Sequence, residues 1–383
     1  LITSLVKLFK TEAKWIVIKF ILGAVPLVYF VLNSSDHGLG TLLGWVATVT
    51  LLVNIIAIGV VVAIQDSKIE IVRRRIISWV GLALGVSSLI ALGMDSSEEG
   101  VGFMVAGSLL SCFPGFARLV RSDLLLRTGG QLPFFLFVLA ESAASLDSVE
   151  NWLLVNVVLF IFFMVVVWPR WTTNRLSVLC LCLVKRAWRA NILRGIASNA
   201  SKRGEGALLG VLEPDQFITI KIIRYFFSLS QTLSVFVFDV LRTSNFSNFS
   251  LEHVRPWVRA LSDLTSNCGT RLALSGLSGS IVFCCWYLLG NALGLAALPI
   301  LFTLTFVLQQ VTAPMLAFLY QKRANAVLNW LAFLSFTYIA LGVVTVYLGL
   351  SASSIQVAGV LFGGSLASHV YLVLALRLPS HRD

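Results

Sequence analysis

Long apolar runs recur along the whole chain, and they constrain its fold more than any other feature of the sequence. Most of them approach about 20 residues, the length that a helix needs to cross the hydrocarbon core of a bilayer. The 383-residue chain is 57% hydrophobic and 12% charged, with a mean hydropathy of +0.89. Because a soluble domain carries roughly twice this charged fraction, we predict an all-α polytopic integral membrane protein. The ten expected transmembrane helices are Trp15–Leu32, Leu39–Ile64, Ile76–Met94, Val101–Val120, Leu132–Leu146, Trp152–Trp168, Leu272–Leu289, Ala296–Tyr320, Ala326–Leu350 and Ile355–Leu376.

The charges between these runs alternate along the chain. Gaps after the first, third and fifth runs are neutral or acidic, and gaps after the second, fourth and sixth are basic. Since short basic loops stay in the cytoplasm, the pattern predicts six crossings that start and end there. Basic residues also flank the last four runs, so the C-terminus is expected in the cytoplasm too. The predicted six-plus-four arrangement has an N-terminal membrane block at 1–168, a central cytoplasmic or interfacial segment at 169–271 and a C-terminal membrane block at 272–383.

The central segment carries a basic amphipathic pattern. In RLSVLCLCLVKRAWRANILRGIA, which starts at Arg175, helical spacing places Leu176, Leu179, Leu183, Ala187 and Trp188 on one side. Such a helix suits the membrane surface, where its cations meet anionic lipid headgroups. A helix packed inside a small cytoplasmic domain explains the pattern equally well. The candidates for headgroup or partner binding here and just beyond are Lys185, Arg186, Arg189, Arg194, Lys221 and Arg224.

Residues 217–241, FITIKIIRYFFSLSQTLSVFVFDVL, are long enough to cross a membrane but contain Lys221, Arg224 and Asp239. A cation near a helix centre costs roughly 3 kcal/mol on insertion scales. One extra crossing would also turn the later basic loops, such as the one at Lys322, to the outside. We therefore expect a helix that does not cross, and that lies in the membrane plane, re-enters, or packs under the bundle.

Glu141 is the most unusual residue within the apolar runs. An ionisable group inside a span is costly and marks a functional site by default. Its run is short and has Pro133 near the start, as in the broken helices of transporters. The ordinary alternative is that Glu141 lies one turn from the outer end and reaches the headgroups. Polar residues in or beside spans most often bond neighbouring helices. As a set, the candidates for a transport path are Asn54, Glu141, Gln309, Gln310 and His369.

Small residues at a spacing of four predict close helix packing. In the third and tenth expected spans, GxxxG pairs allow the backbones of neighbouring helices to approach. The packing faces are expected at Gly81, Gly85, Gly359 and Gly363.

Signatures of catalysis, metal binding and cofactor binding are not found in the sequence. There is no HExxH, GxSxG or phosphate-binding glycine loop in a fitting context, and Cys180 and Cys182 form CxC without a histidine nearby. We expect no metal, no cofactor and no enzymatic activity. The net charge of +11 is spread over loops, not over a compact basic domain, which argues against a nucleic-acid partner.

Together these features predict a channel or transporter that passes a small solute, an ion or a lipid. The low number of intramembrane charges favours an alternative, a non-catalytic membrane subunit or scaffold of a larger complex. A lipid scramblase or lipid-binding protein is a third reading, prompted by the basic central segment. The expected partners are the bilayer with its anionic headgroups, and either a second copy of the chain or another membrane subunit.

Overall fold

The computed structural model describes residues 17–18, 20–67, 69–95, 100–119, 130–143, 146–168, 177–192, 195–196, 199, 217–218, 221–222, 304, 308, 327, 329–334, 337 and 362–372. Within these residues every regular element is a helix, so the all-α prediction is confirmed there. The chain divides into two compact units. The first unit comprises Leu1–Gly195 with Gly210–Ile218, and the second comprises Ile196–Leu209 with Thr219–Asp383.

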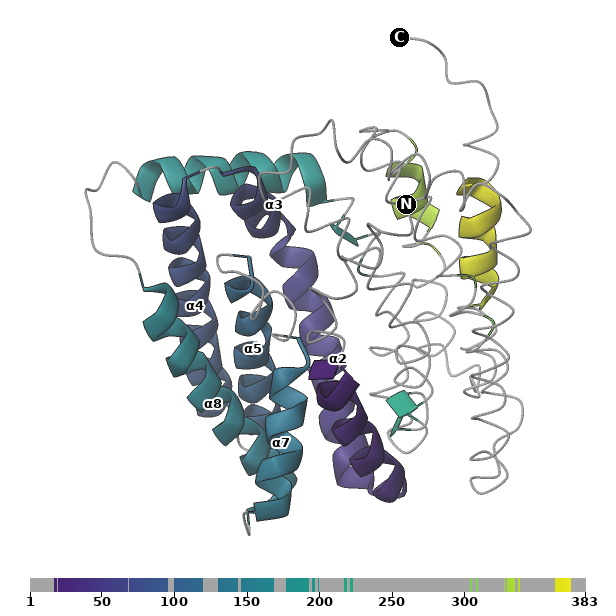
Figure 1. The fold of residues 1–383 in the computed structure, drawn as a ribbon. Helices are drawn as coiled ribbons and strands as arrows, with labels where there is room; N and C mark the ends of the chain where they lie inside the picture. Colours follow the sequence, from purple (N-terminus) through teal and green to yellow (C-terminus); the bar gives the residue numbers. More distant parts are fainter. Residues whose placement is uncertain are drawn as a thin grey trace, which may run out of the picture. The chain divides into compact units, whose positions relative to one another are not determined.

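The first unit is a bundle of helices built around α5, Val101–Ala117 (Figure 1). This helix packs against α2, α4 and α8, and α7 packs against α8. Residues 177–192 add one further helix to the unit. The remaining helices of the bundle are Phe20–Leu32, α2 His37–Ile56, α3 Ile58–Asp66, α4 Glu70–Gly93, α7 Leu132–Ala143 and α8 Ser148–Val167.

Three of the described helices, α2, α4 and α8, are long and apolar enough to cross a membrane. The described helices Phe20–Leu32, α5 and α7 are apolar but shorter. At 12 residues, α7 is about 18 Å long, well below the ~30 Å hydrocarbon core. The described fold is therefore an apolar helical bundle in which three helices could cross a membrane by length and composition, and ten crossings stay a prediction. Of the four expected spans after residue 271, the structure describes residues 362–372 of the last, a few residues of the two before it and none of the first.

The second expected span, Leu39–Ile64, is not one continuous helix. Asp36 caps its beginning, with its side chain accepting a hydrogen bond from the Leu39 backbone N–H at 3.2 Å. The helix then stops at Ala57 and resumes as α3. The interruption lies where residues 177–192 pass over the chain, since a Cβ atom at Gly59 would come within 2.6 Å of the Trp188 Cα.

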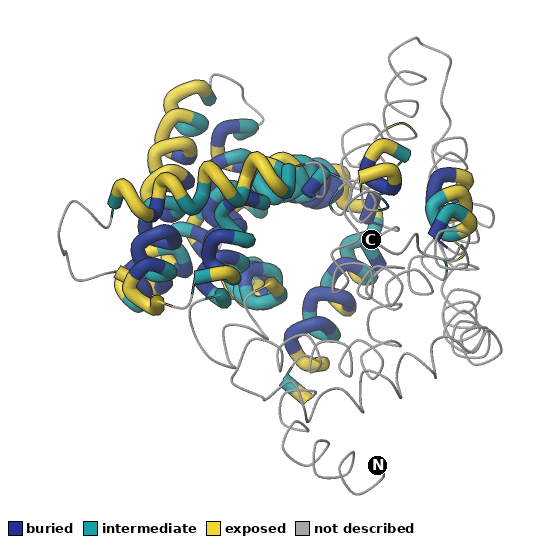
Figure 2. The backbone as a smooth tube through the Cα atoms, turned by 90° about the horizontal axis from the view of Figure 1, so that it is seen from above, coloured by how far each residue is buried: buried dark blue, intermediate teal, exposed yellow. Residues whose placement is uncertain are grey.

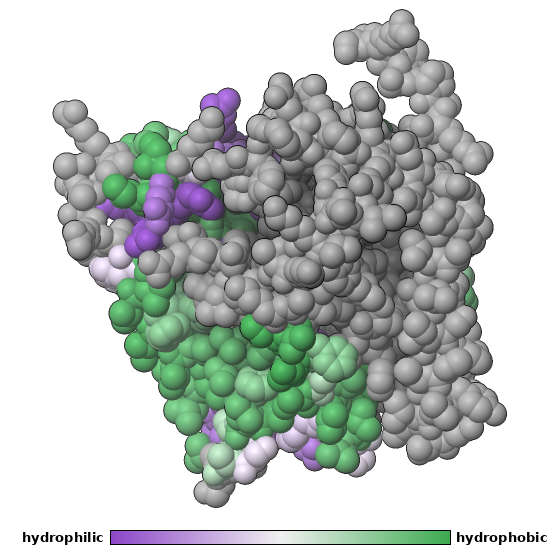
Figure 3. Space-filling view, in the orientation of Figure 1, coloured by the Kyte–Doolittle hydropathy of each residue, from purple (hydrophilic) through white to green (hydrophobic). Residues whose placement is uncertain are grey.

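Both the inside and the outside of the bundle are apolar. Phe113, Trp152 and Phe163 are fully buried between α5 and α8, whereas Leu89 and Val165 are exposed on the outer faces. Figure 3 shows exposed apolar side chains as a broad hydrophobic band on the face of the bundle in view. A soluble protein rarely exposes so much apolar surface, so this band is the part that lipid would cover.

The helix 177–192 lies across the end of the bundle, nearly perpendicular to the long helices (Figure 1). Figure 2 shows an exposed stripe along the side that faces away from the bundle. The side that packs on the bundle core is formed by Cys180, Leu183, Val184 and Ala187. The predicted apolar side was therefore partly wrong, because Leu179 is 46% exposed while Cys180 is fully buried.

The second unit is described in short helical stretches. Its longest described helix covers residues 362–372, with Leu372 fully buried, and residues 329–334 form another stretch. Of residues 217–241, only 217–218 and 221–222 are described; they are helical, with Phe217 and Ile222 buried. The remainder of that segment, and with it the question of a crossing, lies outside the described residues.

Candidate functional site

Glu141 lies near the end of α7 and accepts three hydrogen bonds from side chains. The Tyr29 hydroxyl donates to Oε2 at 3.0 Å, and the Ser148 hydroxyl donates to the same oxygen at 3.1 Å. The Asn151 side-chain amide donates to Oε1 at 3.0 Å. The carboxylate therefore joins the helix Phe20–Leu32 to α7 and α8.

Local structure positions these donors. Ser148 is the first residue of α8, and Asn151 follows three residues later, so both face back toward the end of α7. The Asn151 amide also donates to the backbone carbonyl of Leu146 at 3.0 Å, which fixes the connection between α7 and α8. Tyr29 is held by an edge-to-face contact with Phe137, with ring centroids 6.2 Å apart. The cluster is thus preorganised by both hydrogen bonding and aromatic packing.

Polar groups continue along the buried side of α8. Asn151 and Asn156 have exposed fractions of 0% and 1%, and the Asn156 amide donates to the Trp152 carbonyl at 2.7 Å. Among the described residues, the Oδ1 atoms of both asparagines and the Trp152 Nε1 have no hydrogen-bond partner. Buried polar groups in proteins are normally paired with protein or water.

The other predicted path residues are not part of this cluster. The Asn54 amide donates to the Thr50 carbonyl of its own helix at 2.6 Å. His369 is a half-buried residue of the helix 362–372 in the second unit. Gln309 and Gln310 lie outside the described residues. Among the predicted path residues that the structure describes, Glu141 accepts hydrogen bonds from side chains of other helices.

The cations of the helix 177–192 form a second polar site, at the other end of α8. Lys185, Arg186 and Arg189 are exposed and line an open depression together with Cys182 and Ala190. Hydrophilic atoms gather over this end of the bundle in Figure 3. Arg194 and Arg224 lie outside the described residues, and Lys221 is half-buried in the second unit.

The inner side of the same helix carries a buried thiol. Burial raises the pKa of Cys180 above its ordinary value, and the charge of Arg75 acts in the opposite direction. Arg75 is itself buried, in the second turn of α4. The two sides of the helix 177–192 therefore differ sharply, one being apolar and sequestered and the other cationic and open.

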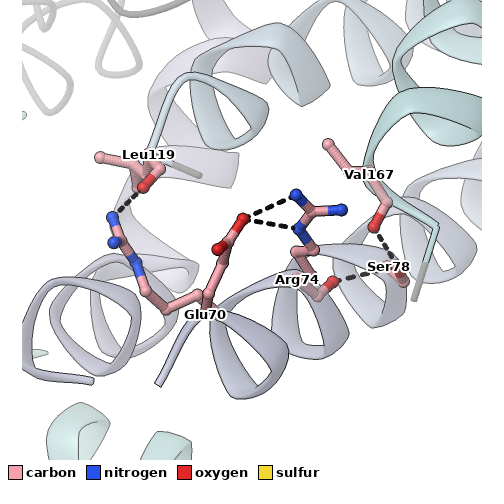
Figure 4. A network of polar contacts seen from close by, with 6 residues as sticks. Glu70, Arg74, Ser78, Leu119 and Val167 are labelled. Atoms are coloured by element: carbon pink, nitrogen blue, oxygen red, sulfur yellow. Dashed lines mark hydrogen bonds and ion pairs between the residues drawn. The ribbon is translucent and has the colours of Figure 1, made fainter. Parts of the chain in front are cut away.

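The basic residues before the third expected span belong to α4, not to a loop. We predicted that span to begin at Ile76, but α4 begins at Glu70 and includes Arg73, Arg74 and Arg75. Figure 4 shows the polar contacts that hold this turn. Arg74 pairs with Glu70 at 2.6 Å, and Arg73 donates to the Leu119 carbonyl. The cations extend the helix because they find acceptors on it and on the end of α5.

Ser78 connects the same end of α4 to α8. Its hydroxyl donates to the carbonyl oxygens of Arg74 at 3.0 Å and Val167 at 3.5 Å (Figure 4). This contact fixes the last turn of α8 beside the helix 177–192, since Val167 and Cys180 lie in the same buried cluster.

The glycines expected at packing faces differ from one another. A Cβ atom at Gly81 would collide with the Met164 sulfur and lie 3.0 Å from the Phe113 ring, so α4 approaches α5 and α8 closely there. At Gly85 the nearest atom would be the Phe160 Cζ at 3.4 Å, an ordinary contact. Gly363 has open space around it, and Gly359 lies outside the described residues.

Tyr29, Ser148 and Asn151 are functional candidates that sequence reasoning missed. Ser148 and Asn151 lie within ten residues of Glu141, so a tight helical hairpin could have suggested them. Tyr29 is 112 residues away, and nothing in the sequence links the two.

Comparisons with known proteins give no match, whether with family models, curated proteins or solved structures. In the described residues, no group of three or more His, Cys, Asp or Glu side chains could hold a metal ion. The observations that bear on function are therefore the Glu141 cluster and the cations of the helix 177–192.

Proposed function

We propose that this integral membrane protein mediates the passage of a small solute, an ion or a lipid. The observation that supports the proposal is the row of buried polar groups that leads from Glu141 along α8. Placing such groups in an apolar bundle costs free energy, and proteins retain them where a polar species must be bound. Glu141 supplies a carboxylate, and Asn151 and Asn156 supply acceptor atoms without a partner in the described structure.

The chemistry of this row favours a cation, a proton or a polar hydrogen-bond donor as the species that binds there. A carboxylate and two amide oxygens are all acceptors, and each offers lone pairs to an incoming donor or cation. The division of the chain into two compact units fits such a role. Transporters are commonly built from two helical repeats or bundles whose relative motion gives alternating access.

Reconstitution of the purified full chain in liposomes tests the proposal. The flux of alkali cations, protons and labelled lipid would be compared for the unchanged protein, Glu141→Gln and Ser142→Ala. Ser142 is the matched control, because it is the next residue on α7 and bonds only to the Val138 carbonyl of its own helix in the described structure, at 2.8 Å. We expect Glu141→Gln to lower flux at least ten-fold, an effect of about 1.4 kcal/mol, and Ser142→Ala to leave it unchanged.

A scaffold subunit is the second candidate, and one observation favours it. All three hydrogen bonds to Glu141 come from side chains of the bundle. A carboxylate that only holds helices together would have the same partners. Absence of flux for every species tested, together with a loss of stability in Glu141→Gln, would favour this candidate. Flux that is unchanged in Glu141→Gln would instead remove Glu141 from the path.

A further inference from the structure

The helix 177–192 is fixed to the bundle, so its outward side has a defined position. Gly59 on α3 allows the Trp188 backbone to approach so closely that a Cβ atom would lie 2.6 Å from its Cα. Cys180, Leu183 and Ala187 are packed into the core cluster on the same side. Because the helix crosses the end of the long helices (Figure 1), it lies in the plane of any membrane that those helices span.

The exposed residues of this helix are those of a membrane-surface helix. Val178, Leu179 and Leu181 are exposed in its first half, and Trp188 is 41% exposed in its second half. Apolar and tryptophan side chains of an in-plane helix enter the boundary between acyl chains and headgroups, and Lys and Arg extend to the phosphates. Lys185, Arg186 and Arg189 form the cationic part of this surface.

No acidic side chain among the described residues neutralises these three cations. Residues 177–192 contain no Asp or Glu. The described ion pair at this end of the bundle is Glu70 with Arg74. Three exposed cations within five residues therefore form a locally uncompensated positive surface, which attracts anionic groups.

We propose that Lys185, Arg186 and Arg189 form a binding site for the phosphate groups of anionic phospholipids in the leaflet on that side. Anionic headgroups complement the charge, and the position of the helix at the bundle end brings them within reach. The exposed leucines and Trp188 supply the apolar contacts that a free phosphate cannot use. The site is independent of transport, since binding requires only that the helix stays on the bundle.

Lipid retention by the purified full chain tests this site. Native mass spectrometry would measure phosphatidylglycerol and phosphatidylcholine bound to the detergent-solubilised protein. Each cation near an anionic surface contributes about five-fold to binding, so Lys185→Gln, Arg186→Gln and Arg189→Gln together are expected to weaken phosphatidylglycerol binding about 100-fold. Phosphatidylcholine binding should be unchanged, and higher salt should weaken only phosphatidylglycerol binding.

Two control variants separate a site from general charge. The triple variant Lys185→Arg, Arg186→Lys and Arg189→Lys keeps the charge and should retain binding. Arg74→Gln removes one cation from the same end of the bundle outside the helix 177–192, so it should weaken binding about five-fold at most, against about 100-fold for the triple glutamine variant. A thermal unfolding midpoint equal to that of the unchanged protein shows that the variants are folded.

Three outcomes would overturn the proposal. The first is equal retention of the two lipids by the unchanged protein. The second is a loss in Arg74→Gln as large as the loss in the triple glutamine variant. The third is complete displacement of phosphatidylglycerol by millimolar inorganic phosphate, which would assign the cations to a soluble anion.

Discussion

The two ends of α8 are both polar, but they use their polar groups in opposite ways. At the first end, the Glu141 carboxylate accepts hydrogen bonds from Tyr29, Ser148 and Asn151, and the cluster closes on itself. At the other end, about 30 Å away along the 20-residue helix, the helix 177–192 directs Lys185 and Arg189 away from the bundle. The first end is held by hydrogen bonds within the protein, next to buried polar atoms that have no partner among the described residues. The other end is an exposed cationic surface.

The difference shows that the presence of a charged residue alone does not distinguish a binding site from a residue that holds helices together. Glu141 and Arg189 are both ionisable residues beside apolar segments, and in sequence they look equally suited to binding. The hydrogen-bond and ion-pair partners distinguish the two cases. Each carboxylate oxygen of Glu141 has a donor from the protein, whereas the exposed cations of the helix 177–192 have no described carboxylate partner. Five predictions test this contrast and the packing behind it, in order of decreasing expected effect.

Replacing Glu141 with Ala is expected to have the largest effect. The substitution would remove the acceptor shared by the Tyr29 and Ser148 hydroxyls and one of the two acceptors of the Asn151 amide, so three part-buried hydrogen bonds would be lost. We expect a loss of about 3 kcal/mol in the free energy of unfolding. Arg189→Gln should change the same quantity by less than about 0.5 kcal/mol, because it is exposed. Thermal unfolding in detergent measures both, and equal effects would remove the contrast between the two ends.

Gly81→Ala should destabilise the bundle by about 2 kcal/mol, because the added methyl group meets Met164 and Phe113 where the core is closely packed. Gly85→Ala is the matched control, one helical turn away, and should cost little since its neighbour lies at van der Waals distance. The same unfolding assay compares them. A larger effect at Gly85 would contradict the observed packing of α4 against α8.

The two cysteines of the helix 177–192 report whether that helix stays on the bundle. Only the thiolate reacts with alkylating agents, and burial raises the pKa of Cys180, so it carries less thiolate at a given pH. In variants that keep one of the two, we expect Cys180 to react about ten-fold more slowly than the exposed Cys182, equivalent to about 1.4 kcal/mol of local opening. The reaction at Cys180 should accelerate as the pH is raised through its elevated pKa.

Gly59→Ala should have the opposite effect on the alkylation rate of Cys180, because it weakens the contact that holds the helix 177–192. Its methyl group would push against the Trp188 backbone, so the helix should separate from α3 and the rate at Cys180 should approach that at Cys182. Unchanged protection of Cys180 in this variant would mean that other contacts hold the helix in place.

Glu70→Gln should have the smallest effect. The Glu70–Arg74 pair is spaced four residues apart on α4, with side-chain exposures of 61% and 29%. Exposed pairs at this spacing contribute about 0.3–0.5 kcal/mol, and salt screens them. Unfolding at low and at high ionic strength should therefore differ slightly for the unchanged protein and not for the variant. A loss above about 1 kcal/mol would show that this turn of α4 is less exposed to solvent than these exposed fractions indicate.

Several elements were predictable because their signals are local. The apolar runs predicted α5 and α8 to within a few residues, since the cores of these helices match the expected fourth and sixth spans. The position of Glu141 in a short helix was also predictable, since α7 has only 12 residues. The break at Ala57 and the rotation of the helix 177–192 were not, because both lie where Gly59 packs against Trp188, in a segment more than 100 residues away.

The sequence by itself determined that this protein is helical and apolar, because hydrophobic periodicity and the scarcity of charge act within each segment. Only the tertiary structure decided which polar groups are satisfied and which are open. Hydrogen bonds and side-chain packing require partners at about 3 Å, and those partners come from helices that the sequence does not connect. Tyr29 beside Glu141, and Gly59 beneath Trp188, are the two contacts on which the proposed functions of this protein rest.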